Sequence, residues 1–378
     1  MKIIAAPNAF KGSMSANEAA EAISEGILRV IPDCEVVCVP VADGGDGLAA
    51  IATEALCGSD CLAAVHGPLM VDLQASFGYV ENTGLAIIEM ANASGLSLLS
   101  DNQLNPMKTT IYGTGELILA AIAKGATRII VGLGGSATCD GGIGMASAIG
   151  YRFLDYDGKE LPPIGGSLND IHSIDNSKVS KQIRNINFEG VCDVTNPLTG
   201  VNGASHVYSP QKGADEDQVR ELDAGLINLA KVVQRDLGVN VSNIAGGGAA
   251  GGLGAGLHCF LGAELRKGID LVLDLVGLRE KIKGADLVIT AEGQIDYQTK
   301  FDKAPIGVAR LARQNNIPCV AVCGGVGERI EELYGEGVDA VFSICSRPIE
   351  LEKAMTDARE MLVDCVEQIV RLYILPNK

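Results

Sequence analysis

Two short acidic segments combine carboxylates with glycine in a way that suits a divalent cation. Asp43 and Asp46 stand in the segment DGGDG, and Glu292 and Asp296 stand in AEGQID, each directly after an apolar run that is predicted to form a strand. Mg²⁺ prefers one or two carboxylates together with phosphate oxygens and water. The sequence therefore predicts a metal–phosphate site, with solvated Asp-Gly turns as the structural alternative.

A glycine-rich segment in the middle of the chain has the composition of an anion-binding loop. Gly134, Gly135 and Ser136 follow the apolar residues 128–131 and precede small residues that are predicted to form a helix. Unhindered N–H groups and a hydroxyl ahead of a helix suit a phosphate or a carboxylate. An ordinary N-cap by Ser136 explains the same pattern without a ligand.

The same region also matches, loosely, a dinucleotide-binding turn. Gly132, Gly134 and Ala137 have the spacing of that fingerprint, and Asp155 lies roughly where a ribose-binding carboxylate would stand. This match keeps open an NAD-dependent dehydrogenase of a small hydroxy acid. A P-loop is absent from the sequence, because the single Gly-Lys pair, at residues 158–159, is followed by glutamate. P-loop nucleotidases are therefore excluded.

Asp193 is the candidate general base. It lies in an apolar run and precedes Asn196 and a proline, so burial would raise its pKa unless it is paired. A turn-capping role for its side chain is the alternative. Lys11, two residues before Ser13 and just after the first predicted strand, has the place of a phosphate contact.

The elements that must position these residues alternate between strand and helix at both ends of the chain. The N-terminal end contains a helix that opens with the capping box SANE, and the C-terminal end closes with a helix over residues 349–372. Strands are predicted over residues 2–6, 35–41, 287–290, 319–322 and 340–344.

The middle of the chain has a different pattern. Residues 73–80 and 85–90, separated by Asn-Thr-Gly, are predicted to form an antiparallel hairpin. The segment AGGGAAGGLGAG, residues 245–256, is predicted to be either a ligand-facing loop or a linker.

These patterns predict an α/β fold of two dissimilar domains. One is a Rossmann-like domain with a parallel sheet built from both chain ends, and the other is an inserted α+β domain. The predicted boundaries are 1–65 and 285–378 for the first domain, which could also include 128–150, and 66–284 for the second.

Composition restricts the partners and the compartment. The 378 residues carry a net charge of −17, which opposes binding to nucleic acid or anionic membranes. Apolar runs are all shorter than the ~18 residues of a membrane span, so a cytoplasmic protein with small-molecule partners is expected. Eleven cysteines without a Cys-x-x-Cys pair indicate reduced thiols.

Longer motifs are distributed along the whole chain, among them PVADGGDG, IVGLGGSATCDGGIGMASAIG, CDVTNPLTGVNGAS and GADLVITAEGQID. Their content and order closely resemble the bacterial glycerate kinase family, of the type that forms 2-phosphoglycerate. The resemblance implies phosphorylation of D-glycerate by ATP with Mg²⁺. It also implies two dissimilar α/β domains, with the active site in the cleft between them.

The resemblance assigns roles to residues of this chain. It implies that Asp193 and Lys11 are catalytic, the first as proton acceptor and the second as a phosphate or carboxylate contact. Substrate or phosphate contacts are expected from Ser13, Gly134, Gly135, Ser136, Asn196 and Lys303, and metal ligation from Asp43, Asp46, Glu292 and Asp296.

Two positions depart from the family pattern. Met70-Val71 stands where the family commonly has Gly-Arg, and Asp302 replaces a glycine before Lys303. Four alternatives stay open: a 3-phosphate product, the dehydrogenase, a non-catalytic anion sensor, and a homodimer rather than a monomer.

Overall fold

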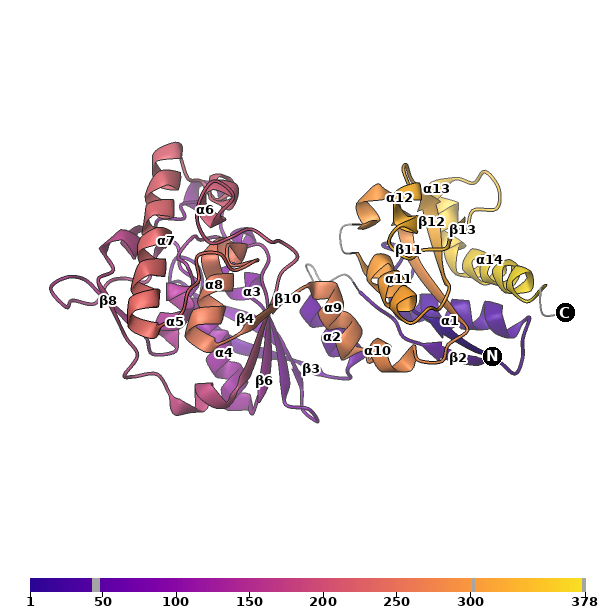
Figure 1. Cartoon of the computed structure of the whole chain (residues 1–378), viewed down its shortest axis with the longest axis horizontal. Coiled ribbons are helices and arrows are strands. Elements are labelled where there is room, and N and C mark those ends of the chain that lie inside the picture. The colour runs from indigo at the N-terminus through magenta and orange to yellow at the C-terminus, as the bar shows by residue number, and fades with distance from the viewer. Residues whose placement is uncertain (43–47, 301–302, 376–378) are drawn as a thin grey trace. The chain divides into compact units, whose positions relative to one another are not determined.

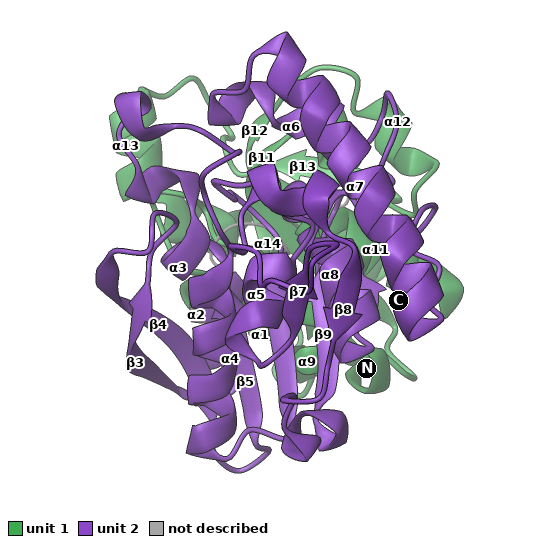
Figure 2. Cartoon of the chain, turned by 90° about the vertical axis from the view of Figure 1, so that its left-hand side faces the viewer, with its two compact units in different colours: residues 1–44, 269–378 green, residues 45–268 purple. Residues whose placement is uncertain are grey.

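The computed structural model describes residues 1–42, 48–300 and 303–375, and the chain divides into two compact units (Figure 2). Unit 1 comprises residues 1–44 and 269–378, and unit 2 comprises residues 45–268. Both are mixed helix and strand structures (Figure 1).

Unit 1 contains a five-stranded, fully parallel sheet with the order β13-β12-β11-β1-β2. Counted along the unit from the β2 edge, this order is 2-1-3-4-5, which is the doubly wound arrangement whose strand order reverses between β1 and β11. The strands are β1 (Lys2–Ala5), β2 (Glu35–Cys38), β11 (Leu287–Ile295), β12 (Cys319–Val326) and β13 (Ala340–Ser343).

Helices cover both faces of this sheet, because successive side chains of its strands alternate between two apolar cores. Ile3 belongs to the core that packs on α1 and α14, whereas Ile4 belongs to the core that packs on α9 and α11. The helices of unit 1 are α1 (Ala16–Leu28), α9 (Gly268–Leu275), α10 (Leu278–Lys281), α11 (Ala304–Gln314), α12 (Glu331–Tyr334), α13 (Leu351–Thr356) and α14 (Ala358–Tyr373).

Local sequence signals account for the helix ends in unit 1. The predicted capping box is present, since Glu18 N donates to Ser15 Oγ at 3.2 Å and Ser15 N donates to Glu18 Oε2 at 2.8 Å. The prediction of a single C-terminal helix over residues 349–372 is wrong. It is divided into α13 and α14 at Asp357, whose ψ of 5° departs from helical geometry.

Unit 2 is built on a six-stranded mixed sheet with the order β10-β9-β6-β5-β4-β3. The β3–β4–β5 portion is antiparallel, which confirms the predicted hairpin, whereas β5, β6, β9 and β10 are parallel. The strands are β3 (Ser59–His66), β4 (Asp72–Val80), β5 (Leu85–Glu89), β6 (Arg128–Gly132), β9 (Asn187–Val191) and β10 (Glu264–Arg266), with a separate pair β7 (Arg152–Leu154) and β8 (Ser173–Asp175).

One apolar core joins the helices of unit 2 to this sheet. The helices are α2 (Leu48–Ala55), α3 (Ala91–Ser94), α4 (Tyr112–Lys124), α5 (Ile143–Ala148), α6 (Ala204–Tyr208), α7 (Glu216–Leu237) and α8 (Ala249–Leu261), and 3₁₀ turns include η5 (Pro210–Lys212). Asp215 caps α7 with its side chain.

The borders of the units differ from the predicted domain boundaries at both junctions. Unit 2 begins at residue 45 rather than 66, because α2 packs on β4 and β5. Unit 1 resumes at residue 269 rather than 285, because Ile269 and Leu273 of α9 enter its core. Strand β6, which lies within the residues 128–150 that could belong to either domain, is central to the sheet of unit 2.

The glycine-rich segment 245–256 is neither a linker nor a ligand-facing loop. It is largely buried and forms the beginning of α8, with positive φ at Gly246 before the helix and at Ala250, Gly251 and Gly252 within its first turn. A Cβ on Gly251 would lie 2.0 Å from Thr138 O, and one on Gly252 would lie 2.8 Å from Gly141 Cα. Glycine therefore permits two backbone segments to pack directly against each other beneath the loop that follows β6.

Candidate active site

Five of the predicted site residues line one cavity of unit 1. The cavity has a volume of about 590 Å³ and lies where the loop after β1 meets the carboxyl-terminal half of β11. This is the point at which the strand order of the sheet reverses, the usual ligand position in doubly wound folds. The predicted residues in its lining are Lys11, Ser13, Glu292, Asp296 and Lys303.

The loop after β1 is fixed to its neighbour by backbone hydrogen bonds. Asn8 N donates to Ala291 O at 2.7 Å, and Phe10 and Met14 form an isolated bridge in which Phe10 N donates to Met14 O at 3.0 Å. Gly12, with φ of +79°, makes the turn between them. The result is a tight loop that carries an exposed Lys11 to the cavity.

The acidic side of the cavity comes from β11 and the turn after it. Glu292 is 8% exposed, and its Oε1 lies 3.4 Å from the Nζ of Lys303, the residue that precedes α11. Asp296 is half-buried and accepts a hydrogen bond from Gln298 N at 2.8 Å through Oδ1. Asp296 thus both caps a turn and lines the cavity, so the two explanations of this acid are compatible.

The structure describes only two of the four expected metal ligands, Glu292 and Asp296. Asp43 and Asp46 lie outside the described residues. Within residues 1–42, 48–300 and 303–375, no three His, Cys, Asp or Glu side chains converge on one point as a ready-made metal site. Glu292 and Asp296 line the same cavity, and two carboxylates are enough for Mg²⁺ when phosphate oxygens and water complete its shell.

The remaining predicted residues lie in unit 2, in loops that follow its parallel strands. The loop after β6 contains Gly134, Gly135 and Ser136, and the loop after β9 contains Asp193 and Asn196. Because carboxyl ends of parallel strands share one edge of a sheet, these loops lie along the same edge of unit 2.

The loop after β6 is held by the segment that follows α3. Leu96 N donates to Gly135 O at 2.7 Å, and Ala137 N donates to Ser94 O at 3.0 Å. Gly135 has a φ of +65° and lines a cavity of about 720 Å³. Across the described parts of the chain, the N–H groups of Gly134, Gly135 and Ser136 have no protein acceptor, which is the condition for a backbone anion site.

The structure corrects two explanations of this loop. Helix α5 begins at Ile143 behind Gly142 and has no side-chain cap, so Ser136 neither caps it nor stands at its N-terminus. A dinucleotide turn also requires a helix directly after the glycines, and none is there. Asp155, the supposed ribose ligand, instead accepts hydrogen bonds from Asp157 N and Lys159 N in a turn.

Asp193 does not have the buried environment in which its pKa would rise. Its side chain is exposed, because β9 ends at Val191 and the chain enters a loop before reaching it. Its Oδ1 accepts a hydrogen bond from Gly268 N at 2.9 Å. The carboxylate is therefore oriented by a backbone donor without being removed from water.

Asn196 is engaged within its own loop. Its Oδ1 accepts from Tyr208 Oη at 2.7 Å, its Nδ2 donates to Asn202 O at 2.8 Å, and its carbonyl accepts from Gly248 N at 2.9 Å. These bonds make Asn196 the residue that fixes the loop after β9.

Two buried charged residues next to the loop after β6 were missed from the sequence. Asp140 is fully buried, and desolvation raises its pKa to about 6 although the N–H groups of Ile111, Gly142 and Gly144 donate to it. Lys212 is 2% exposed, and burial lowers its pKa to about 8. Asp140 lies in the motif GGSATCDGG, so it could have been proposed as a site residue from the sequence. Lys212 lies in a polar stretch in which no local pattern distinguishes it from a surface lysine.

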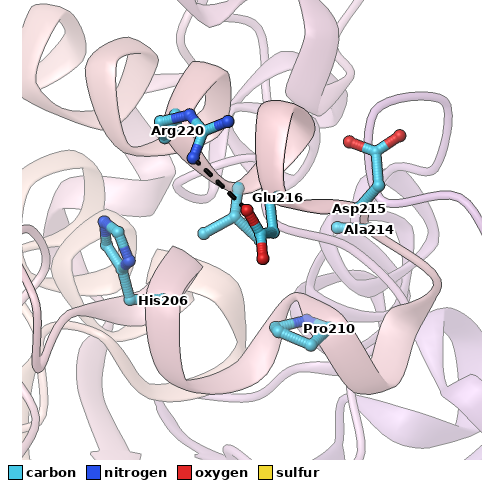
Figure 3. A pocket seen from close by; sticks show the side chains of 7 residues that line it. His206, Pro210, Ala214, Asp215, Glu216 and Arg220 are labelled. Carbon is cyan, nitrogen blue, oxygen red and sulfur yellow. Dashed lines mark ion pairs between the residues drawn. The ribbon is translucent and has the colours of Figure 1, made fainter.

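A third cavity contains none of the predicted residues. It has a volume of about 560 Å³ and lies around the beginning of α7 (Figure 3). The charged groups of its lining are Asp215, Glu216 and Arg220, and Arg220 pairs with Glu216 at 3.7 Å. One cation against two carboxylates gives this cavity no positive potential for an anionic substrate.

All eleven cysteines are free thiols, as their spacing predicted. Among the described helices, none is both long and apolar enough to cross a membrane. The cytoplasmic location stays a prediction.

Lysines and carboxylates at the reversal point of a doubly wound sheet, with a glycine-rich loop after a parallel strand of a second, mixed sheet, are typical of an α/β enzyme for small anionic substrates. Comparison with known proteins makes this class specific. The model of the glycerate kinase family matches residues 3–374. The chain belongs to the glycerate kinase family, and it is therefore a phosphotransferase.

Individual relatives agree over nearly their whole length. The chain is 45% identical to glycerate 2-kinase of Escherichia coli strain K12 over 358 residues, which cover 95% of this chain and 94% of that protein. It is 45% identical to glycerate kinase of Bacillus subtilis strain 168 over 362 residues, covering 96% and 95%. A crystal structure assigned to a glycerate kinase 2 of Salmonella typhimurium LT2 matches with a TM-score of 0.86 at 43% identity, covering 100% of this chain and 99% of that one. The resemblance and the α/β fold class predicted from the sequence are thus confirmed.

Proposed function

We propose that this protein transfers the γ-phosphoryl group of ATP to the 2-hydroxyl of D-glycerate, with Mg²⁺ as cofactor. The full-length similarity to glycerate 2-kinase of Escherichia coli carries the proposal. The cavity of unit 1 supports it, because its lysines and carboxylates have the charges that a nucleotide phosphate and its cation need.

Lys11 and Lys303 are assigned to contact the negatively charged phosphate or carboxylate groups of the substrates. Both line the cavity, and an ammonium near a phosphoryl group offsets charge that a protein of net charge −17 otherwise repels. Ser13, half-buried in the same lining, is assigned a hydrogen bond to the same ligand.

Glu292 and Asp296 are proposed to hold Mg²⁺ in the cavity of unit 1. Asp43 and Asp46, the other expected ligands, lie outside the described residues. When bound, the cation neutralises the charge on the phosphate oxygens. The ion pair between Lys303 and Glu292 fits this assignment, because it keeps both side chains directed at one part of the cavity.

In unit 2, Gly134, Gly135 and Ser136 are proposed to bind an anionic group of a substrate through their N–H groups. Asn196 is proposed to support the substrate contact by fixing the neighbouring loop. Asp193 is proposed to accept the proton of the glycerate hydroxyl. Its exposure leaves the carboxylate accessible to a substrate hydroxyl, and the bond from Gly268 N orients it.

The test is a glycerate-dependent ADP-release assay with ATP and Mg²⁺, followed by identification of the product by ³¹P NMR. We expect 2-phosphoglycerate. A 3-phosphate product would replace the regiochemistry and keep the kinase, whereas NADH formation from glycerate and NAD without ADP release would support the dehydrogenase. Binding of glycerate with no turnover would support the anion sensor.

A further inference from the structure

A lysine is buried directly behind the glycine-rich loop of unit 2. Lys212, the last residue of η5, is 2% exposed, and its Nζ donates to Ser136 Oγ at 2.6 Å and to Thr138 O at 2.6 Å. Burial of an ammonium group is costly unless hydrogen bonds and nearby negative charge offset it. Two hydrogen bonds to neutral oxygens and the charge of the buried Asp140 carboxylate offset this cost only in part, since burial still lowers the pKa of Lys212 to about 8.

The hydrogen bond to Ser136 fixes which way that hydroxyl donates. An ammonium group has only donors, so Ser136 Oγ must be the acceptor in this pair. The hydroxyl proton therefore points away from Lys212, and the described part of the chain offers it no acceptor. Ser136, itself 4% exposed, is thus an oriented donor that has no acceptor within residues 1–42, 48–300 and 303–375.

The neighbouring backbone points to the same conclusion. The N–H groups of Gly134, Gly135 and Ser136 have no acceptor among the described residues. Gly135 and Gln211, the residues beside Ser136 and Lys212 in sequence, line the same cavity of about 720 Å³. The loop thus carries four donors, with one buried cation bonded to it through Ser136, and it reaches the cavity at Gly135, where Glu89 and Asp101 are the acidic residues of the lining. This is a donor set that an anionic oxygen would complete.

We propose that Lys212 is a positioning residue of an anion site at this loop: it holds the Ser136 hydroxyl as a donor toward the ligand and supplies a buried positive charge behind it. The inference rests on the proposed function for the identity of the anion, which is the carboxylate of glycerate or a phosphate group of ATP. Both present the same chemistry, an oxygen that carries negative charge and accepts several short hydrogen bonds.

The test is a double-mutant cycle of Lys212→Met and Ser136→Ala. We measure kcat and separate KM values for glycerate and ATP, and the binding of glycerate, of inorganic phosphate and of an ATP analogue by calorimetry. Each single variant is expected to weaken one ligand about 10- to 100-fold, with a smaller change in kcat, and the affected ligand identifies the source of the anion. In the Ser136→Ala background, Lys212→Met is expected to add much less than it does alone.

Matched controls separate positioning from general stability. Ser205 is also fully buried and donates to Val219 O at 2.6 Å within unit 2, so Ser205→Ala removes a comparable internal bond. Lys231 is an exposed lysine of α7, so Lys231→Met removes the same charge at a distance from the loop. Both controls are expected to leave the KM values unchanged.

Should Lys212→Met not fold, the wild-type enzyme still tests the inference. The ¹⁵Nζ resonance of Lys212 is expected to shift on addition of the anion that binds the loop, and this shift is expected to disappear in Ser136→Ala. An unshifted resonance at saturating glycerate and at saturating ATP analogue would overturn the inference. So would full additivity of the two substitutions, because Lys212 would then act independently of Ser136.

Failure of the proposed function would look different. An enzyme that binds an anion through Ser136 and Lys212 without phosphorylating glycerate would refute the kinase assignment and keep the inference. An active glycerate kinase in which both single variants bind glycerate and ATP as tightly as the wild type does would support the kinase assignment and refute the inference about Lys212.

Discussion

The two units place candidate site residues at the carboxyl edge of parallel strands, but they build their sites from different materials. In unit 1 the cavity is lined by full charges on side chains, with Lys303 and Glu292 3.4 Å apart. In unit 2 the loop after β6 offers backbone N–H groups and one oriented hydroxyl, with its charge buried behind it at Lys212.

This difference assigns different work to the two regions. Apart from the buried Glu292, the charges of unit 1 are exposed or half-buried, and they can adapt to a polyanion and a hydrated cation because long side chains and water rearrange around them. A backbone-built loop cannot rearrange in that way, so it suits a small group that must be held in one orientation. We therefore expect changes in unit 1 to alter metal and nucleotide use and changes in the loop of unit 2 to alter the KM of a small anion.

The largest expected effect tests the charged site. Excess EDTA is expected to lower glycerate-dependent ADP release by about 10³-fold or more, because the cation offsets several kcal/mol of developing charge. Restoration by added MgCl₂, with an unchanged Tm in EDTA, would assign the loss to catalysis. Full activity in EDTA would contradict the metal assignment of Glu292 and Asp296.

The next effect concerns the proton acceptor of unit 2. Asp193→Asn keeps an oxygen for Gly268 N and removes the base, so kcat is expected to fall by about 10²–10⁴-fold with little change in Tm. Asp155→Asn is the matched control, because Asp155 also accepts backbone hydrogen bonds in a loop of the same unit. Turnover within about threefold of the wild type would transfer the role of the base to another carboxylate.

The comparison also explains how much could be predicted from the sequence. The strands and the capping box of unit 1 follow local rules, because apolar alternation and Ser15 with Glu18 specify them within a few residues. Lys11 and Glu292 were recognisable for the same reason, since each follows an apolar run, although β11 continues past Glu292 to Ile295 where the sequence predicted a loop.

The site of unit 2 was harder to predict, because tertiary packing decides its properties. Exposure of Asp193 depends on β9 ending at Val191, and the start of α5 at Ile143 depends on the glycine contacts with α8. The contact between Lys212 and Ser136 joins residues 76 positions apart, which no local pattern encodes.

A smaller effect tests the backbone-built loop. Gly135 has a φ of +65°, so Gly135→Val strains the loop and displaces its N–H groups from the ligand. The KM of the anion bound there is expected to rise about 10- to 100-fold. Gly158→Val is the matched control, since Gly158 has a φ of +79°, no atom within 4 Å of an added Cβ, and a place in a turn away from the loop. Equal KM values for Gly135→Val and Gly158→Val would show that the loop after β6 is a structural turn that does not bind the anion.

The smallest effect tests whether the charge behind the loop is buried as the comparison requires. Burial lowers the pKa of Lys212 from 10.5 to about 8, so between these pH values the unfolded chain binds more protons than the folded chain at this residue. Stability from this group is therefore lowest below pH 8 and rises as the pH increases toward 10.5. Lys212→Met lacks this contribution. Subtracting its free energy of unfolding from that of the wild type removes the contributions that thiols and tyrosines make equally to both proteins in the same pH range.

We expect the unfolding free energy of the wild type, minus that of Lys212→Met, to rise by about 1–2 kcal/mol from pH 8 to pH 10 in urea titrations. A saturating anion at the loop should flatten this rise by keeping Lys212 protonated in the folded state. A flat difference without the anion would mean that water reaches Lys212, and the contrast between an adaptable charged site in unit 1 and a rigid, desolvated one in unit 2 would fail.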